Sequence, residues 1–467
     1  MESKTMYAAV KESALEVPHS TAVFYKGKKI SYKKFIKLID RMADILVNRL
    51  NVKEGDTVLV AQPNIPEVLI VTYALNKIGA IVNLVHPFTP YNQIVAIYQK
   101  THSNLAILFE QRIAKEVEQY REFAPNCVVT RIEDFLPVGK KFIYHTFMNR
   151  AIRRKLGKWR GKFDGFTYLK SLKPTHHPVK EITNDPNKTA IMLHSGSTTG
   201  DPKTICLNND SFNFIGEHAY EFIGLGKEEL KNTFMLSVLP SFHGFGLCMT
   251  MHTPLVCRFG CALVPKFSSA DVVEIMNKVK LSCMCGIPAI YETLLQDPKF
   301  IKHRRLKYLH ICFCGGDSMN VSLKKRWDAS MKENGSICQV FEGYGLTEAI
   351  AVNCVNTFKH NKEGSIGYPA SGFEFIIIDE KENHLKANEL GQICVKSKAN
   401  MLHYFENEEA TKNTFTKDGY LKTGDVGYID EDGYIFFKQR AKRVIKVSGV
   451  GVFPSEIEQL IQSVPGV

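Results

Sequence analysis

Residues 190–207 read AIMLHSGSTTGDPKTICL, and the rest of the chain is best interpreted outward from this stretch. Ala190–Leu193 are all apolar and predict a buried strand. The loop that follows combines glycines, three consecutive hydroxyls and a closing Pro-Lys, namely Gly196, Ser197, Thr198, Thr199, Gly200, Pro202 and Lys203. Small residues let backbone N–H groups approach an anion, hydroxyls add donors, and a lysine adds positive charge. The loop predicts a polyphosphate site; it is not the Walker pattern, and the alternative is a polar surface loop.

Length and composition describe a globular protein with more than one core. The 467 residues exceed what one ordinary core holds, so two or three subdomains are expected. Hydrophobic residues make up 44% of the chain and charged residues 23%, which is typical of soluble proteins. The net charge of +12 favours an anionic partner: a nucleotide, a cofactor, a membrane surface or a nucleic acid. Because no nucleic-acid module is apparent, a small phosphorylated ligand is preferred.

The cysteines and the apolar windows bear on location. The chain has 12 cysteines and no Cys-x-x-Cys. Cys283/Cys285 and Cys312/Cys314 lie in apolar runs at a strand-like spacing, which predicts buried thiols rather than a zinc site. Many free thiols and no secretory leader predict a cytoplasmic protein. The most apolar window, Val68–Val85, is interrupted by polar residues and predicts a helix followed by a strand, not a membrane span.

Strands alternate with helices along most of the chain. The expected strands include Ala22–Tyr25, Lys29–Ser31, Thr57–Ala61, Ile81–Val85, Leu105–Phe109, Phe234–Leu239, Ala262–Val264, Cys283–Gly286, Leu309–Cys314 and Cys338–Tyr344. The expected helices include Tyr32–Leu50, Glu67–Ile78, Thr89–Lys100, Ser269–Val279, Ala289–Leu295 and Ser322–Lys332. This alternation predicts an α/β fold with two helix-covered, mostly parallel sheets over about residues 1–372.

From about Phe373 the pattern changes to short strands separated by turns. Strands at Phe375–Asp379, Gly391–Lys396, Gly427–Ile429 and Tyr434–Lys438 predict a β subdomain, a distorted barrel, over about residues 373–440. Val444–Lys446 and Phe453–Ile461 then predict a strand and a helix. Residues 441–467 are expected to begin a small, mobile α+β C-terminal domain that this chain does not complete.

Residues 139–173 form a basic insertion in which lysines and arginines are interleaved with apolar residues. The insertion is interpreted as a solvated surface segment. The alternative is a basic amphipathic segment that contacts an anionic membrane, which would suit a greasy substrate. A disordered linker is disfavoured because the apolar content is substantial.

Residues that suit ligand chemistry follow several of the expected strands. The loops that contain these residues are Pro240–Gly244, Gly315–Asp317 and Gly345–Glu348. Ligands of parallel sheets sit beyond the carboxyl ends of the strands, so we expect these loops to converge with the 195–203 loop.

Four residues are candidates for contacts with a nucleotide. Glu348 predicts a Mg²⁺ ligand, because that ion takes carboxylate and phosphate oxygens together; the alternative is a surface carboxylate. Thr347 either donates to a phosphate or caps a helix. Asp425 either accepts from two ribose hydroxyls or occupies a turn. Arg440 either binds phosphate or ribose or is solvated.

Taken together, these stretches resemble the AMP-forming acyl-CoA synthetases of the adenylate-forming superfamily, which also holds peptide-synthetase adenylation domains and luciferases. The five matching stretches, in the family's order and spacing, are Ser195–Lys203, Pro240–Gly244, Gly315–Asp317 with Gly343–Glu348, Tyr420–Asp425, and Arg440–Glu458. The resemblance covers essentially the whole chain.

The resemblance implies an ATP site. It assigns the β- and γ-phosphates to the loop that contains Ser195, Gly196, Ser197, Thr198, Thr199, Gly200 and Lys203. It places adenine against Tyr344, between Gly343 and Gly345, with the backbone of Gly315, Gly316 and Asp317 along the edge of the base. It assigns the α-phosphate to Thr347, Mg²⁺ to Glu348, and the ribose to Asp425 and Arg440.

The resemblance also implies sites for the acid and for CoA. His243 would lie beside the acyl site, between the carboxylate and the CoA tunnel. Arg443 matches the hinge about which the C-terminal domain rotates between half-reactions, and Ser448 and Gly449 match a loop that lines the pantetheine path.

The implied reaction has two steps. A carboxylate oxygen attacks the α-phosphorus of ATP to give acyl-AMP and pyrophosphate, and the CoA thiol then displaces AMP. Positive charge and hydroxyl donors must stabilise the phosphates, which is what the predicted site supplies. No covalent enzyme nucleophile is needed, which agrees with the absence of a Ser-His-Asp or Cys-His set.

Three departures from the family pattern stand out. Ser197 replaces a common glycine in the loop, and Gln439 replaces glycine or aspartate before Arg440. The family's adenylation lysine lies near the end of a C-terminal domain of about a hundred residues. Residues 441–467 are expected to include only the start of that domain and not its lysine. We therefore expect this chain to be a fragment or a shortened form that binds ATP but adenylates poorly.

The acid is expected to be apolar. No aspartate stands near Pro240–Gly246 to pair with a substrate amine, which argues against amino acids. The expected pocket residues are mostly apolar and favour a fatty acid, or else an aryl acid: Phe242, His243, Cys285, Ile287, Phe313, Gly316, Phe341 and Gly343. The alternatives are an acyl-AMP ligase that loads a carrier protein, an ATP- or acyl-binding fragment without turnover, and a peripheral membrane module.

Overall fold

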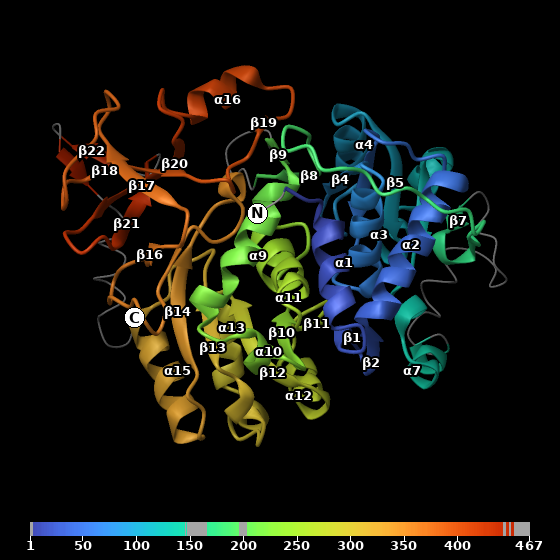
Figure 1. The fold of residues 1–467 in the computed structure, drawn as a ribbon, viewed down its shortest axis with the longest axis horizontal. Coiled ribbons are helices and arrows are strands. Elements are labelled where there is room, and N and C mark those ends of the chain that lie inside the picture. The colour runs from blue at the N-terminus through green and yellow to red at the C-terminus, as the bar shows by residue number, and fades with distance from the viewer. Residues whose placement is uncertain are drawn as a thin grey trace.

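The computed structural model describes residues 3–144, 146, 166–195 and 203–441, and the backbone of residues 445–447 and 450–452. These residues form two large sheets, one smaller antiparallel sheet and a two-stranded ribbon. The large sheets lie next to each other across the molecule, with the smaller sheet at one end (Figure 1).

The nine-stranded sheet is mostly parallel, as the sequence predicts. Its order is β16 (Tyr368–Pro369), β15 (Cys354–Val355), β14 (Gln339–Tyr344), β13 (Ile311–Cys314), β12 (Lys280–Gly286), β10 (Thr233–Ser237), β11 (Gly260–Leu263), β1 (Thr21–Tyr25) and β2 (Lys28–Ser31). Strands β10 to β14 run parallel, and β1 joins β11 in parallel. The N-terminal strands therefore complete a sheet whose other strands come from the second half of the chain.

The eight-stranded sheet carries the start of the candidate phosphate loop. Its order is β19 (His403–Tyr404), β9 (Thr204–Leu207), β8 (Ile191–His194), β4 (Ile81–Leu84), β3 (Thr57–Ala61), β5 (Ser103–Phe109), β6 (Cys127–Thr130) and β7 (Thr167–Tyr168). In sheet order, the strands β8, β4, β3, β5, β6 and β7 are all parallel to their neighbours. Strand β9 pairs antiparallel with both β8 and β19. Neither β9 nor β19 was expected from the sequence.

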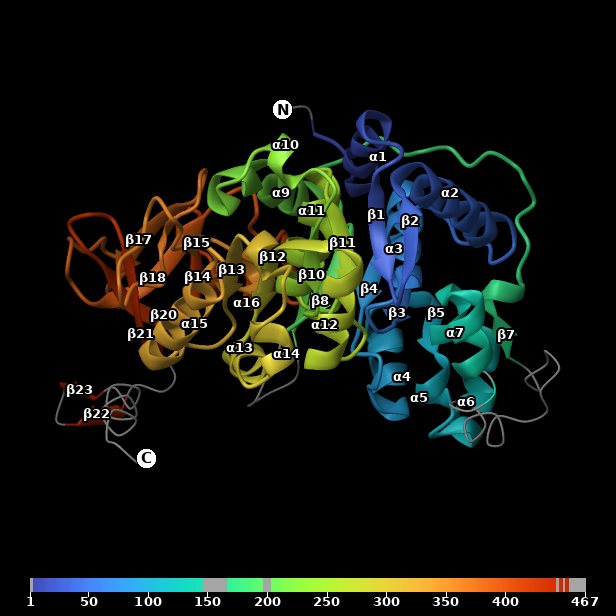
Figure 2. The same ribbon diagram turned by 90° about the horizontal axis from the view of Figure 1, so that it is seen from below.

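Helices connect and cover these strands (Figure 2). The longer ones are α1 (Met6–Glu16), α2 (Tyr32–Asn48), α3 (Pro66–Lys77), α4 (Tyr91–Lys100), α9 (Asn209–Ile223), α12 (Ser269–Lys278), α13 (Pro288–Leu295) and α15 (Val321–Glu333). Every residue of α3 is buried, so this helix lies in the interior. Helix α2 buries a stripe that includes Phe35, Ile39 and Leu46, as its helical spacing predicts. One continuous apolar core joins the two large sheets.

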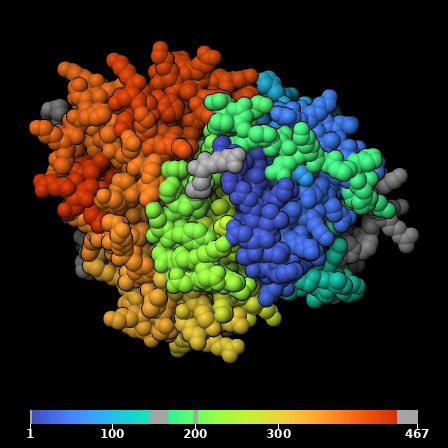
Figure 3. Space-filling model, viewed as in Figure 1, coloured from blue at the N-terminus to red at the C-terminus, as the bar shows by residue number. Residues whose placement is uncertain are grey.

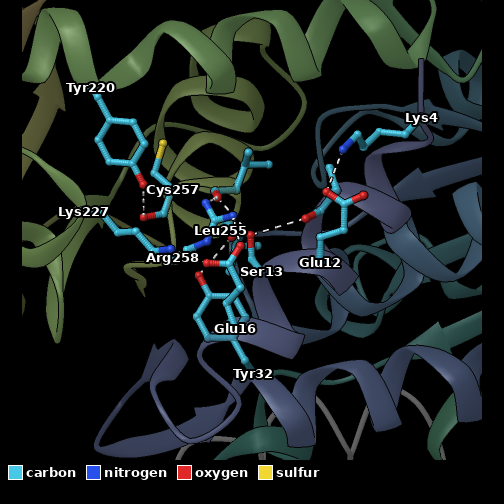
Figure 4. A network of polar contacts seen from close by, with 12 residues as sticks. Lys4, Glu12, Ser13, Glu16, Tyr32, Tyr220, Lys227, Leu255, Cys257 and Arg258 are labelled. Atoms are coloured by element: carbon cyan, nitrogen blue, oxygen red, sulfur yellow. Dashed lines mark hydrogen bonds and ion pairs between the residues drawn. The ribbon is translucent and has the colours of Figure 1, made fainter. Parts of the chain in front are cut away.

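A polar network fixes the N-terminal helices to the second half of the chain (Figure 4). Glu16 of α1 pairs with both Lys227 and Arg258, and hydrogen bonds from these two side chains lower the pKa of Glu16 to about 2. The phenol of Tyr32 donates to the carbonyl of Leu255 at 3.0 Å. Figure 3 shows the N-terminal segment in blue packed directly against the green segment that follows residue 200.

The smaller sheet has the order β17 (Glu374–Ile378), β18 (Gly391–Lys396), β20 (Leu421–Ile429) and β21 (Ile435–Arg440), with antiparallel neighbours. It confirms the expected β region, while its closure into a distorted barrel stays a prediction. The division at residues 372/373 and 440/441 also stays a prediction, and β19 from this region joins the eight-stranded sheet. Strand β22 (Ile445–Val447) matches an expected strand; the expected helix Phe453–Ile461 lies outside the described residues.

Other sequence predictions can be compared directly. All 12 cysteines are buried free thiols, and no group of three potential metal-ligating side chains occurs among the described residues. Over that same part of the chain, no helix has both the length and the apolarity needed to cross a membrane. Of the basic insertion, the structure describes α7 (Val138–Ile143), β7 and the 3₁₀ turn Leu169–Ser171; residues 145 and 147–165 lie outside it.

Candidate active site

The base of the candidate phosphate loop is closed by two reciprocal hydrogen bonds. The backbone N–H of Ser195 donates to the carbonyl of Lys203 at 2.9 Å, and the N–H of Lys203 donates to Ser195 Oγ at 3.0 Å. Strands β8 and β9 lead into and out of the loop as an antiparallel pair, with His194 opposite Thr204. The loop residues Gly196, Ser197, Thr198, Thr199 and Gly200 lie outside the described residues, so their contacts stay predictions.

A buried histidine supports this base. His194 Nε2 lies 2.7 Å from Asn83 Oδ1, and its Nδ1 lies 3.2 Å from Thr204 Oγ1. Burial, and to a lesser extent the charge of Lys100, lowers the pKa of His194 to about 4. The imidazole is therefore neutral near neutral pH and ties β8, β4 and β9 together below the loop.

One tyrosine brings Lys203 and Glu348 together. The Nζ atom of Lys203 lies 4.4 Å from the centroid of the Tyr404 ring, and the Tyr404 phenol donates to Glu348 Oε1 at 2.9 Å. Burial and the nearby Glu348 carboxylate raise the pKa of Tyr404, which keeps the phenol a donor. The backbone N–H of Met401 also donates to the carbonyl of Glu348 at 2.6 Å. The predicted cation thus lies over the ring of the tyrosine whose phenol donates to the predicted metal ligand.

The turn that carries Thr347 and Glu348 is tightly constrained. A Cβ on Gly345 would lie 1.5 Å from the carbonyl oxygen of Ala351, so no side chain fits there. Ile350 has φ +24° and Ala351 φ +68°, a region that β-branched Ile350 adopts only under strain. Thr347 begins the 3₁₀ turn Thr347–Ala349 without a side-chain capping bond, so the capping alternative is wrong.

A second cluster lies where β14 meets β20. The phenol of Tyr344 donates to Asp425 Oδ2 at 2.5 Å, and Arg440 Nε lies 3.1 Å from Asp425 Oδ1. Burial raises the pKa of Asp425, although the Tyr344 hydrogen bond and the charge of Arg440 act in the opposite direction. Among the described residues, Oδ1 receives no hydrogen bond of good geometry. Asp425 stands within a nine-residue strand, so the turn alternative is wrong, and its spare acceptor fits a hydroxyl donor such as a ribose.

The glycine loop after β13 packs against β14. A Cβ on Gly315 would lie 3.0 Å from the carbonyl oxygen of Gly343, and Gly316 has φ +80°. Asp317 is exposed and accepts a hydrogen bond from the N–H of Ser318 at 2.8 Å. The structure therefore brings Gly315 beside Gly343, while the contact of this loop with adenine stays a prediction.

His243 lies on a loop that an asparagine of the other sheet holds in place. Asn64 donates to the carbonyls of Ser237 and Leu239 at 3.2 and 2.8 Å and accepts from the N–H of Ser241 at 3.1 Å. The chain then enters a π-helix, Phe245–His252, a rare geometry that is often found at functional sites. Gly246 permits it, because a Cβ there would lie 2.0 Å from the Pro240 carbonyl oxygen.

The ring of Phe242 packs against the exposed side chain of His243. The His243 ring lies 4.6 Å from that of Phe242, whose ring lies 4.8 Å from that of His86. Burial, followed by the proximity of His86, lowers the pKa of His243, although part of the side chain remains accessible to solvent.

The expected acid-pocket residues divide into two groups. Cys285, Phe313 and Phe341 lie in register on three neighbouring strands, but all three are covered by protein. Ile287 is 40% exposed, and Phe242 is partly exposed. In this conformation the second group and His243 are accessible to an acid, as are the backbone positions Gly316 and Gly343.

Of the residues predicted to contact a nucleotide, Lys203 and Glu348 meet at Tyr404, and Tyr344 and Arg440 meet at Asp425, while the contacts of the others stay predictions. Arg443, Ser448 and Gly449 lie outside the described residues. Sequence reasoning missed Tyr404 and Asn64. A short aromatic run, His403–Phe405, and the position of Asn64 after a strand end were the available signals.

Comparisons with known proteins agree with this geometry. A family model described as AMP-binding enzyme matches residues 10–405. The long-chain-fatty-acid–CoA ligase of Bacillus subtilis is 27% identical over 464 residues, covering 99% of this chain and 81% of that protein. The probable 4-coumarate–CoA ligase 3 of Dictyostelium discoideum is 30% identical, covering 90% of this chain and 74% of that protein.

Solved structures share the fold. The anthranilate CoA ligase AuaEII in complex with anthranoyl-AMP superimposes with a TM-score of 0.83 at 20% identity, covering 99% of this chain and 83% of that one. ATP-bound MatB from Rhodopseudomonas palustris gives a TM-score of 0.82 at 21% identity, with 99% and 84% covered. Together with the family match over most of its length, these similarities show that the chain belongs to the AMP-binding enzyme family, whose curated relatives include acyl-CoA ligases.

Proposed function

We propose that this protein is an AMP-forming acyl-CoA synthetase, which joins a carboxylic acid to CoA and converts ATP to AMP and pyrophosphate. The observation that carries the proposal is the contact of both Lys203 and Glu348 with Tyr404, beside the closed base of the candidate phosphate loop. A cation and a carboxylate held together at such a loop suit a polyphosphate and its counter-ion.

In the first step, a carboxylate oxygen of the acid attacks the α-phosphorus of ATP. The bond from this phosphorus to the β-phosphate oxygen breaks, and pyrophosphate leaves. Lys203 stabilises the negative charge on the leaving group, while Thr347, Thr198 and the other loop donors bind phosphate oxygens. Asp425 accepts from the ribose hydroxyls through its spare lone pair, with Tyr344 against the base.

The residues present fit one Mg²⁺ ion held by Glu348. A single carboxylate is sufficient, because Mg²⁺ in nucleotide sites is bound by one or two carboxylates, substrate phosphates and water. When bound, the ion would neutralise charge on the phosphates.

In the second step, the CoA sulfur attacks the acyl carbon and the bond to the AMP oxygen breaks. The thiol proton needs an acceptor. His243 suits this role, because burial and His86 lower its pKa and leave the imidazole neutral near neutral pH. Arg443 as a hinge, Ser448 and Gly449 on the CoA path, and a C-terminal unit from residue 441 belong to the same proposal.

We propose a fatty acid as the substrate class and an aryl acid as the alternative. The accessible apolar residues Phe242 and Ile287 support an apolar acid. The names of the relatives, a long-chain-fatty-acid–CoA ligase and a probable 4-coumarate–CoA ligase, support the same two classes. The 12 free thiols support a reducing compartment, and we assign the reaction to the cytoplasm.

The test is a panel of fatty and aryl acids incubated with the protein, ATP, Mg²⁺ and either CoA or a phosphopantetheinylated carrier protein. Mass spectrometry measures AMP and the thioester. We expect AMP and acyl-CoA to form together with a fatty acid. The thioester on carrier protein alone would favour the carrier-loading alternative, and ADP in place of AMP would contradict the proposal. Glu348→Gln should abolish both products, and Glu363→Gln, at an exposed glutamate, should not.

A further inference from the structure

Four lysines from separate segments converge at one end of the molecule. They are Lys28 of β2, Lys34 of α2, Lys141 of α7 and Lys170 of the 3₁₀ turn Leu169–Ser171. The Nζ atoms of Lys28 and Lys170 lie 5.2 and 5.4 Å from the centroid of one ring, that of Phe135. Burial and the charges of the other three lysines lower the pKa of Lys28, as expected where like charges are crowded.

Three acidic side chains on neighbouring elements already have partners, and buried Glu67 near Lys170 has its pKa raised to about 8 by burial, so it is mostly uncharged at neutral pH. Glu274 pairs with Lys140, Asp271 with Lys26, and Asp134 with Arg131. The positive charge of the cluster is therefore available to an external anion.

Helix α7 places uncovered apolar side chains next to the same lysines. Val138 is 88% exposed, Phe142 69% and Ile143 57%, and no residue of this helix is buried. The helix is nonetheless anchored, because Lys140 pairs with Glu274 of α12 and a Cβ on Gly27 would lie 3.9 Å from Pro137. Large apolar side chains held outward from an anchored helix favour an apolar partner.

We propose that these four lysines together with Val138, Phe142 and Ile143, here called the α7 surface, dock on an anionic lipid bilayer. The three apolar side chains enter the headgroup region. The lysine ammonium groups contact lipid phosphates, and their apolar stems lie along the apolar surface. A nucleic acid would use the cations but leave the aliphatic side chains in water. This inference does not depend on the proposed reaction.

The position of the α7 surface is compatible with catalysis at the candidate site. Helix α7 lies at one end of the molecule and the small sheet β17, β18, β20 and β21 at the other, in both views (Figures 1 and 2). Strands β9 and β19, which flank the Lys203–Tyr404 contact, are also distant from α7 in Figure 1. A bilayer on the α7 surface therefore leaves the nucleotide residues uncovered.

The test is co-sedimentation of the protein with vesicles of phosphatidylcholine alone or mixed with phosphatidylserine. We expect partitioning to the mixed vesicles that weakens as salt is raised. The triple variant Lys28→Glu/Lys34→Glu/Lys170→Glu should lower the partition coefficient at least about 100-fold. The double variant Phe142→Ser/Ile143→Ser should lower it about tenfold or more.

Matched control variants distinguish a specific effect of the α7 surface from a general effect of altered net charge or lost apolar side chains. The variant Lys381→Glu/Lys386→Glu/Lys398→Glu changes the net charge equally at exposed lysines of the small-sheet region, and Ile337→Ser/Leu390→Ser changes two other exposed apolar residues. Both should bind vesicles like the unaltered protein, and circular dichroism should show all variants folded. The proposal would be overturned if the controls lost as much vesicle binding as the test variants, or if the protein did not bind vesicles at all. It would also be overturned if the protein bound an RNA homopolymer and the Phe142 and Ile143 substitutions left that binding unchanged.

Discussion

The phenol of Tyr404 lies 2.9 Å from Glu348 Oε1 and donates a hydrogen bond to it, while Lys203 Nζ lies over the same ring, 4.4 Å from its centroid. Strand pairing maintains this relationship, because β19, which contains Tyr404, is hydrogen-bonded to β9, which begins directly after Lys203. The distance between the phosphate loop and the Glu348 turn is therefore set by a tyrosine that contributes no charge of its own.

Tyr404→Phe should impair the use of Mg²⁺ and ATP without unfolding the protein. The variant keeps the ring beneath Lys203 and loses only the hydrogen bond to Glu348, and a hydrogen bond to a charged group contributes about 1.5–3 kcal/mol. We expect acyl-AMP formation to fall about tenfold or more and half-saturation to need more Mg²⁺. Tyr428→Phe is the control, at a tyrosine of β20 whose ring stacks on Phe436. An unchanged Mg²⁺ dependence would assign Tyr404 to packing alone.

Asp425→Asn should weaken nucleotide binding while leaving stability intact. The variant keeps the volume and an acceptor for Tyr344 but loses the negative charge, and charge-assisted bonds to ribose contribute about 1.5–3 kcal/mol. Calorimetry should show AMP binding weakened about tenfold or more.

The stability of Asp425→Asn provides a second readout. Burial raises the pKa of Asp425 above that of the unfolded chain, so this carboxyl contributes stability at low pH that is lost as pH rises through the folded pKa. The free energy of unfolding at neutral pH should therefore be equal to or above that of the unaltered protein. Asp432→Asn, at an exposed aspartate paired with Lys362, should leave AMP binding unchanged. Equal AMP affinity in both variants would argue against a ribose contact at Asp425.

Gly345→Ala should disable the Glu348 turn. The added methyl would lie 1.5 Å from the Ala351 carbonyl oxygen, so the strained segment at Ile350 and Ala351 must move. We expect a loss of about 1–3 kcal/mol in the free energy of unfolding and at least about hundredfold lower acyl-AMP formation. Gly139→Ala in α7 meets no atom within 4 Å and should leave both quantities unchanged or slightly raise stability. Wild-type activity in Gly345→Ala would contradict the packing of this turn.

Two histidines should each weaken the protein below about pH 6.5, opposed by Glu67 and Glu342, whose pKa values burial raises to about 8 and about 7. Burial lowers the pKa of His194 to about 4 and that of His252 to about 3, from 6.5 in the unfolded chain. As pH falls below 6.5, the unfolded chain binds protons that the native state excludes. Each histidine should lower the free energy of unfolding by about 1.4 kcal/mol per pH unit.

Urea denaturation between neutral pH and about pH 5, above the range in which most carboxyls titrate, measures this slope. His252→Gln removes one of these groups and should change the slope by about 1.4 kcal/mol per pH unit relative to the unaltered protein. His102→Gln, at a side chain that is 70% exposed, should leave the slope unchanged. A slope insensitive to His252 would mean that other groups control the acid response.

The sequence predicted regular elements well where pattern and turn signals coincide. Thr57–Ala61 and Gly391–Lys396 occur with the expected bounds, because apolar runs between Gly-rich turns leave little freedom. Strand β9 was missed, since Thr204–Leu207 becomes a strand by pairing with β8 and β19, which come from distant segments. The π-helix at Phe245–His252 was missed for a similar reason, because it depends on backbone contact between Gly246 and Pro240.

In the candidate site, too, some residues could be predicted from local sequence, whereas their contacts with distant segments could not. Glu348 and Asp425 could be named from their motifs, because a glycine and a hydroxyl side chain precede each of them closely in the sequence. Their surroundings could not be predicted: Asp425 was compatible with a turn until strand pairing placed it opposite Arg440. Tyr404 has no motif of its own, and its role arises only when β19 joins the eight-stranded sheet.

The most direct test of the central claim follows the oxygen atoms of the acid. A fatty acid labelled with heavy oxygen in its carboxylate is incubated with the protein, unlabelled ATP, Mg²⁺ and CoA, and the products are weighed by mass spectrometry. If the carboxylate attacks the α-phosphorus, the AMP released with acyl-CoA carries one labelled oxygen, and Glu348→Gln releases almost none. Unlabelled AMP, or label in inorganic phosphate with ADP as the nucleotide product, would contradict the proposed reaction.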